Sequence, residues 1–236
     1  MKNAFVAISV LAMATLAASP SHAVTTHEAE FVCPIDGTAF RSLVFTSFYI
    51  ADRRLDSRPV YGGSPQFLPK PECPGNGFII YKAKFDDDEI RKAKKFIETI
   101  EFTAMRRDHV SSARAALIAE QIGDDTLTVS WLYLQAAWEA EDLNKSVQEQ
   151  EAYLGKSLTS LEAHLAGETL SADRWQGKLL AAELSRRVGH FEAALAHLAN
   201  LALEANDLNA VILHKVAEEI ARLARQGIRS PALIPR

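Results

Sequence analysis

Two short patterns of the same form lie in the first third of the chain and constrain its path. Cys33 and Cys73 each begin a Cys-Pro-x-x-Gly pattern, and they are the only cysteines in the sequence. A zinc ribbon normally uses Cys-x-x-Cys twice, so that four thiolates surround one tetrahedral ion. Here Asp36 and Asn76 occupy the positions of the second sulfurs. The patterns therefore indicate the two knuckles of a ribbon that has lost its metal.

Residues 1–23 have the features of a secretory signal sequence. Lys2 provides a positive charge, and the apolar stretch that follows is too short to span a bilayer as a helix. Residues 21–23 fit the small-x-small rule for cleavage, so we expect the mature chain to begin at Val24. The alternative is an uncleaved N-terminal anchor or a buried helix. No later run of apolar residues is long enough to cross a membrane, so we expect a periplasmic or secreted protein.

The charge balance narrows the class of partner. The net charge of -4 argues against a general nucleic-acid binder, because such proteins usually carry a basic surface. The hydrophobic content of 48% is normal for a globular chain and excludes wholesale disorder. The charge and composition therefore argue for a folded protein that does not bind nucleic acid.

The N-terminal part of the mature chain differs in composition from the rest. Residues 24–85 contain most of the nine prolines, together with the runs that favour β-structure. Residues 40–49 and 77–82 are the predicted strands. This composition predicts a small, ribbon-like β/loop subdomain.

Residues 86–226 have a helical composition, because alanine and leucine dominate and proline is absent. The pattern predicts about six or seven helices, arranged as hairpins with an extra helix.

The acidic run at residues 86–89 is expected to cap the first helix. A metal site is the other interpretation of this run, although the spacing of a calcium loop is absent. Residues 227–236 are expected to form a flexible tail.

One helical pair is especially clear, in residues 180–198. Ala182 allows two helices to approach closely, and Gly189 permits a turn between them. Phe191 begins the second helix, and Ala194 follows where only a small side chain fits. This pair resembles a tetratricopeptide repeat, and an ordinary helical hairpin is the alternative.

A nearly all-apolar segment precedes this pair. Trp131, Leu134 and Trp138 fall on one face of a predicted helix. Large apolar residues at this spacing are more typical of a protein core than of a ligand cage.

Most of the mature chain resembles the bacterial domain-of-unknown-function family 2225. In that family, a ribbon with C-P-x-C-G and C-P-x-C-G-Y knuckles precedes a tetratricopeptide-like helical array. The resemblance implies this fold, but no reaction is established for the family. Residues 36 and 76 depart from the four-sulfur pattern, so zinc binding does not carry over. The matching residues are Cys33-Pro34, Gly37, Phe40, Cys73-Pro74, Gly77-Phe78, Ala136-Ala137-Trp138, Glu183-Leu184, Arg187, Gly189 and Glu192-Ala193-Ala194.

The ribbon geometry implied by this resemblance would bring Cys33 and Cys73 together. In an oxidising compartment they are then expected to form a disulfide, which would stabilise the fold by roughly 4 kcal/mol. One alternative is a mixed zinc site of Cys33, Asp36 and Cys73, completed by a histidine or water. A redox-active pair is another alternative, although no Cys-x-x-Cys remains to lower a thiol pKa.

A mixed-charge cluster in the proline-rich part contains Arg53, Arg54 and Arg58. These arginines could contact an anion or a partner. The alternative is a solvated loop in which neighbouring charges pair with one another.

The sequence contains none of the common catalytic motifs, such as H-E-x-x-H, G-x-S-x-G or a P-loop. We therefore expect a non-enzymatic scaffold or adaptor that has no cofactor and binds a protein or peptide. The alternative function is metal binding or thiol redox chemistry in the cell envelope, through Cys33 and Cys73.

Overall fold

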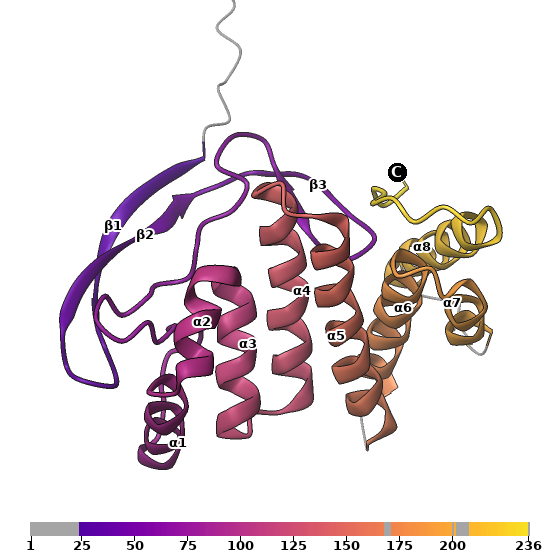
Figure 1. The fold of residues 1–236 in the computed structure, drawn as a ribbon. Helices are drawn as coiled ribbons and strands as arrows, with labels where there is room; N and C mark the ends of the chain where they lie inside the picture. Colours follow the sequence, from indigo (N-terminus) through magenta and orange to yellow (C-terminus); the bar gives the residue numbers. More distant parts are fainter. Residues whose placement is uncertain (1–23, 168–170, 200, 202–207, 236) are drawn as a thin grey trace, which may run out of the picture.

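The computed structural model describes residues 24–167, 171–199, 201 and 208–235. The predicted signal sequence, residues 1–23, lies outside the described residues. The described part is mainly helical with a small β region at its N-terminal end, which confirms the predicted fold class (Figure 1). Within this part, none of the helices has the length and apolar character that crossing a membrane requires.

The β region consists of two antiparallel pairs of strands. β1 (Thr25–Val32) pairs with β2 (Ala39–Ser47), and β3 (Ile50–Arg53) pairs with β4 (Pro59–Tyr61). β2 confirms the first predicted strand, and the rings of Phe31 and Phe40 stack across the β1–β2 pair with centroids 5.7 Å apart. In Figure 1 this long hairpin lies at the α1 end of the helices.

The second predicted strand, residues 77–82, does not form. Gly77 takes a left-handed φ of +77°, and the chain bends again at residues 82 and 83. Between these points only Ile79 forms a bridge, to Glu72. The segment is too short to pair as a strand because it begins inside the turn that follows Cys73.

The described residues form eight helices after these strands, whereas the sequence predicts about six or seven. The difference arises after the acidic run, where the chain forms two helices, Asp87–Ile97 and Ile100–Asp108. Thr99 Oγ1 accepts the N–H of Phe102 and starts a new helix, while extended backbone at His109 and Val110 ends it. The helices are α1 (Asp87–Ile97), α2 (Ile100–Asp108), α3 (Ser111–Ile122), α4 (Thr126–Asp142), α5 (Val147–Ala166), α6 (Ser171–Arg187), α7 (Phe191–Leu198) and α8 (Leu208–Arg225).

The acidic run starts α1, as the capping interpretation predicts. Asp86 accepts the N–H of Glu89, and the Glu89 carboxylate accepts the N–H of Asp86. These reciprocal bonds form a capping box, which satisfies N–H groups that have no partner within the helix.

The start of α3 is capped by a side chain from another helix. Val110 stands at the cap position and has no side-chain oxygen to offer. Glu139 of α4 accepts the N–H groups of Ser111 at 3.0 Å and of Ser112 at 2.8 Å. Glu139 is buried, so its carboxylate both satisfies this helix end and joins α3 to α4.

Helices α3 to α6 lie side by side in chain order (Figure 1). Their core includes the fully buried Leu134, and the half-buried Trp131 and Trp138 pack against it with ring centroids 6.5 Å apart. The expected helical pair is present as α6 and α7, with Gly189 at a left-handed φ of +88° in the turn. Ala182 and Ala194 are both buried.

The C-terminal segment packs against the fold, contrary to the expectation of a flexible tail. The Leu55 N–H donates to Ala232 O, and the Ile234 N–H donates to Arg53 O, both at 2.9 Å. The segment thus lies beside β3 like an additional strand, where these backbone groups would otherwise lack protein partners. Apolar side chains at 228, 232 and 234 also pack against buried residues, so burial as well as hydrogen bonding holds the segment.

Candidate functional site

The two cysteines form the disulfide that the sequence predicts. Cys33 Sγ and Cys73 Sγ are 2.19 Å apart, and their Cα atoms are 5.5 Å apart. The cysteines are 1% and 0% exposed, respectively. Such burial keeps an external thiol from reaching the bond, because exchange requires direct attack on a sulfur atom.

The knuckles around the disulfide have the same backbone geometry. Gly37 donates its N–H to Cys33 O at 2.9 Å, and Gly77 donates to Cys73 O at 3.0 Å. Both glycines have left-handed φ angles, +76° and +77°. Each cysteine N–H then donates across its turn, to the carbonyl oxygen five residues later, at 2.8 Å. The repeated Cys-Pro-x-x-Gly pattern therefore encodes one local structure twice.

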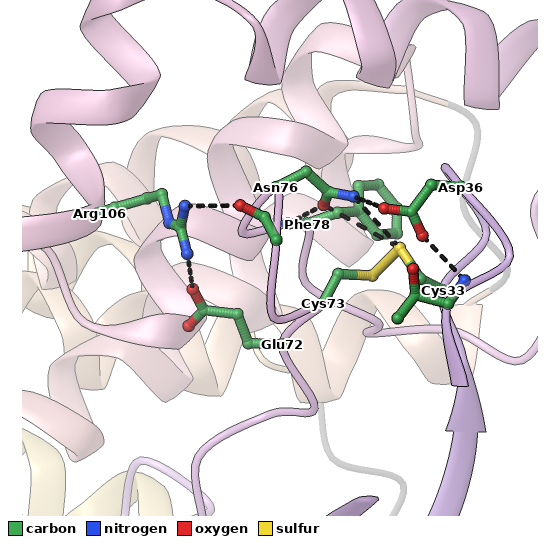
Figure 2. Close-up of a disulfide and its surroundings, with 9 residues drawn as sticks. Cys33, Asp36, Glu72, Cys73, Asn76, Phe78 and Arg106 are labelled. Carbon is green, nitrogen blue, oxygen red and sulfur yellow. Dashed lines mark hydrogen bonds and ion pairs between the residues drawn. A yellow bond between two sulfur atoms is a disulfide. The ribbon is translucent and has the colours of Figure 1, made fainter. Parts of the chain in front are cut away.

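The two residues that replace sulfurs in the pattern contact each other (Figure 2). Asn76 Nδ2 donates to Asp36 Oδ2 at 2.9 Å and lies 3.4 Å from Cys33 Sγ. Each side chain also accepts a backbone N–H in its own knuckle, from Thr38 to Asp36 and from Phe78 to Asn76, at 2.9 Å. The Thr38 backbone N–H is the main cause of the lowered Asp36 pKa, so this carboxylate stays ionised at neutral pH.

The alternative metal set of Cys33, Asp36 and Cys73 is therefore close together in space. With the disulfide formed, however, neither sulfur is a thiolate, and the thiolate is the form that binds metal. Among the residues that the structure describes, no group of three or more histidine, cysteine, aspartate or glutamate side chains is placed to hold a metal ion.

Glu72 joins the second knuckle to the helices. Its two carboxylate oxygens accept from Arg106 of α2 at 3.2 Å and from Arg114 of α3 at 2.8 Å. Arg106 also donates to Gly75 O (Figure 2). Burial raises the Glu72 pKa, but the two arginines outweigh it and the pKa is lowered. These contacts fix the knuckle against α2 and α3.

The predicted arginine cluster is divided in the structure. Arg53 is exposed and donates to Ser57 O. Arg54 reaches Glu141 of α4 at 2.5 Å and Asp56 at 2.5 Å. Arg58 is buried and donates to both oxygens of Asp142 at 2.6 Å. Arg54 and Arg58 thus serve an internal network, and neither is in a solvated loop.

Arg187 of α6 completes this network. It donates to Asp56 at 3.1 Å and to Glu141 at 2.7 Å. The indole N–H of Trp138 also donates to Asp56, which is fully buried. Burial raises the Glu141 pKa, but hydrogen bonds and charges from Arg54 and Arg187 lower it to about 2. The network joins the β3–β4 loop to α4 and α6, and its three arginines balance its three carboxylates.

A pocket next to this network was not predicted from the sequence. It has a volume of about 230 Å³ and lies between the β region and α4. None of the described residues that line it is a carboxylate, histidine, cysteine or serine. Its lining comprises Phe45, Arg58, Pro59, Tyr61, Gln66, Phe67, Leu68, Lys70, Gln135 and Trp138.

An exposed apolar patch adjoins the pocket at the turn between β2 and β3. Phe48, Tyr49 and Ile50 are 51%, 51% and 37% exposed. The Phe48 ring centroid is 6.0 Å from that of Phe45 and 5.1 Å from that of Tyr61, both of which line the pocket. The only sequence signal for this patch is the run of three large apolar residues at a turn, where polar residues are usual.

A larger hollow, of about 690 Å³, lies beside the first knuckle between residues 30–34 and 80–85. One of its lysines, Lys82, is paired with Glu89 at 2.6 Å and with Asp124 at 2.7 Å. These ion pairs hold the segment before α1 against the loop between α3 and α4.

Comparison of the chain with protein-family models, with curated proteins and with solved structures finds no match.

Proposed function

We propose that the protein is an exported, non-enzymatic interaction module that binds a peptide or protein segment with apolar side chains and a negative charge. The observation that carries this proposal is the apolar patch of Phe48, Tyr49 and Ile50 beside the pocket. Exposed apolar residues that form a contiguous patch are a common feature of interaction sites. The charge follows from the pocket, whose lining includes Lys70 and no carboxylate.

The lining of the pocket supports binding rather than catalysis. Aromatic and aliphatic side chains dominate it, and the polar groups are a lysine, an arginine, two glutamines, the Tyr61 hydroxyl and the Trp138 indole N–H. The guanidinium of Arg58 is engaged by Glu141 and Asp142. The described lining contains none of the histidine, cysteine, aspartate or glutamate side chains that most often act as general acids and bases.

Export to the periplasm or the medium is part of the proposal. The Cys33–Cys73 disulfide supports it, because structural disulfides persist in oxidising compartments. Two likenesses stay hypotheses: that of the chain to domain-of-unknown-function family 2225, and that of α6 and α7 to a tetratricopeptide repeat. They are supported by paired knuckles that precede side-by-side helices.

The alternative function, metal binding or thiol redox chemistry, requires the disulfide to open. Both cysteines are buried and held within the core. A redox-active sulfur is normally accessible to its reaction partner, so this environment favours a structural disulfide.

Site-specific photo-crosslinking tests the proposal. A benzophenone amino acid at Phe48 should capture a partner in cells that produce the protein, whereas the same group at the exposed Glu192 of α7 should not. The captured partner would then be purified. It should bind the unmodified protein at least about tenfold more tightly than the Phe48→Ser variant. Identical capture at both positions, or equal affinity for both proteins, would exclude the patch as the docking site.

A further inference from the structure

The pocket beside the apolar patch contains a lysine without an acidic partner. Lys70 Nζ donates to Gln135 Oε1 at 2.5 Å. Among the residues that the structure describes, no carboxylate lies within ion-pair distance of this nitrogen, although most buried charges are paired. An ammonium group has three N–H donors, so Lys70 has donors left for a ligand.

Two charged groups near Lys70, Glu139 and Arg58, already have other partners. Glu139 attracts Lys70 from a distance, but its oxygens accept four hydrogen bonds from Ser111 and Ser112. Arg58, the other cation of the lining, is held by Glu141 and Asp142. Lys70 is therefore the cationic group of the pocket that an anionic ligand can still neutralise.

The walls around Lys70 suit an apolar group. Phe45, Tyr61, Phe67 and Trp138 contribute aromatic surface to a volume of about 230 Å³. An acidic ligand without an apolar body would leave these walls in contact with water. A large apolar residue that carries a carboxylate would bury them and neutralise the lysine together.

We propose that this pocket binds the C-terminal carboxylate of a partner peptide whose last residue is aromatic or aliphatic, with Lys70 as the counter-ion. The inference rests on the proposed function and names the group that the partner inserts. The last side chain would occupy the aromatic walls, and the preceding residues would run over Phe48 and Ile50. Gln135, whose oxygen accepts from Lys70, has amide N–H groups for the second carboxylate oxygen.

An aspartate or glutamate side chain fits this site less well. Its carboxylate sits on one or two methylene groups, which would leave most of the aromatic surface uncovered. A C-terminal phenylalanine or leucine provides the charge and the apolar body in one residue. Burial lowers the Lys70 pKa, and the distant charge of Glu139 offsets this only in part, which agrees with a cation that has no carboxylate in contact until a ligand arrives.

Calorimetric titration with short peptides tests the inference. The probes are acetyl-glycyl-glycyl-phenylalanine, its C-terminal amide and 3-phenylpropionate. We expect the free-acid peptide to bind at least about tenfold more tightly than the amide, because the amide lacks the charge that Lys70 neutralises. Equal binding of acid and amide, or binding of neither, would overturn the inference. Binding of 3-phenylpropionate as tight as that of the peptide would overturn the assignment to a peptide terminus.

Matched lysine variants locate the effect. Lys70→Met keeps the aliphatic stem and should abolish the preference for the acid, whereas Lys70→Arg should retain it. Lys84→Met changes an exposed lysine outside this pocket and should bind like the unmodified protein. A Lys70→Met protein that still prefers the acid would overturn the role of Lys70. The comparison of acid and amide on the unmodified protein does not depend on whether a variant folds.

The outcomes also separate this inference from the proposed function. A partner captured at Phe48 that binds equally well with an amidated C-terminus would overturn the inference and leave the interaction function intact. Conversely, acid-specific peptide binding without any partner captured at Phe48 would support the pocket and contradict the docking patch.

Discussion

Asn76 donates a 2.9 Å hydrogen bond to the carboxylate of Asp36, across the disulfide that joins their knuckles. In a four-sulfur ribbon, these two positions would carry the remaining metal ligands. Here they form a neutral donor with an ionised acceptor, while the cysteines form a covalent bond. The connection between the knuckles is thus supplied by a disulfide and a hydrogen bond.

Loss of the disulfide should lower the stability of the protein. We expect the Cys33→Ala, Cys73→Ala double variant to lose roughly 4 kcal/mol in free energy of unfolding, because the bridge restricts the unfolded chain. Urea unfolding followed by circular dichroism measures this difference. A double variant as stable as the unmodified protein would mean that the helices alone determine stability.

Unmodified protein in native buffer should also resist a thiol reductant, because both cysteines are buried.

Replacement of Asn76 by aspartate should destabilise the knuckles in a pH-dependent way. The Asn76→Asp variant loses the donor to Asp36 and places two carboxylates side by side. We expect its stability deficit to be largest at neutral pH and to shrink as the pH falls and one carboxylate takes up a proton. Asn76→Ala serves as the control, since it removes the donor without adding charge. An equal deficit for both variants at every pH would contradict the electrostatic explanation.

Several features of this fold follow from local sequence, and others depend on distant partners. The repeated Cys-Pro-x-x-Gly pattern specifies both knuckles, and Asp86 with Glu89 specifies the start of α1. The pairing of Arg54 with Glu141 joins residues 87 positions apart, so no local pattern reveals it. Glu139 likewise resembles any helix glutamate in sequence, although it caps α3.

The candidate site was harder to predict than the fold for the same reason. Arg53, Arg54 and Arg58 are close in sequence, but burial against α4 and α6 separates their roles. Lys70 lies in a proline-rich loop without any recognisable motif. It lines the pocket only because Gln135 and Trp138 are brought beside it by the packing of α4.

Neutralisation of Glu141 should disturb the charge network at the centre of the molecule. Glu141→Gln removes one of the two carboxylates that Arg54 and Arg187 share, so that three arginines face two carboxylates; removing one partner of a buried charge pair costs about 3–5 kcal/mol. Glu28→Gln is the matched control, because Glu28 pairs with Arg41 on the surface, where such pairs contribute less than about 1 kcal/mol. Chemical unfolding at pH 7 measures both. Equal effects of the two changes would contradict the role assigned to the network.

The same residue should make stability depend on pH. Its folded pKa of about 2 lies below the ordinary value of 4.5, so ionised Glu141 stabilises the folded state above pH 4.5. This contribution, about 3 kcal/mol, should disappear as the pH falls from 4.5 towards 2. In Glu141→Gln the corresponding loss should be absent. An unchanged pH profile in the variant would show that other carboxylates control acid unfolding.

Removal of the C-terminal segment should destabilise the whole fold. Arg186 is buried and donates to Ile228 O at 2.5 Å and to Ser230 O at 3.1 Å. A chain that ends at Gly227 leaves these donors without their carbonyl partners and exposes the edge of β3. Hydrogen bonds from charged groups contribute about 1.5–3 kcal/mol each, so we expect a loss of at least about 3 kcal/mol.

A shorter truncation provides the control for this experiment. Removal of Pro235 and Arg236 keeps the backbone bonds of Ala232 and Ile234 to the β3 region, so the unfolding midpoint of this shorter chain should match that of the full chain. Thermal unfolding of the two truncated proteins compares them directly. If the chain that ends at Gly227 unfolds at the same temperature as the full chain, that result would contradict the packed position of the segment. The segment joins β3 to the end of α6, so its loss should also loosen the network around Arg187, visible as faster amide exchange in that helix.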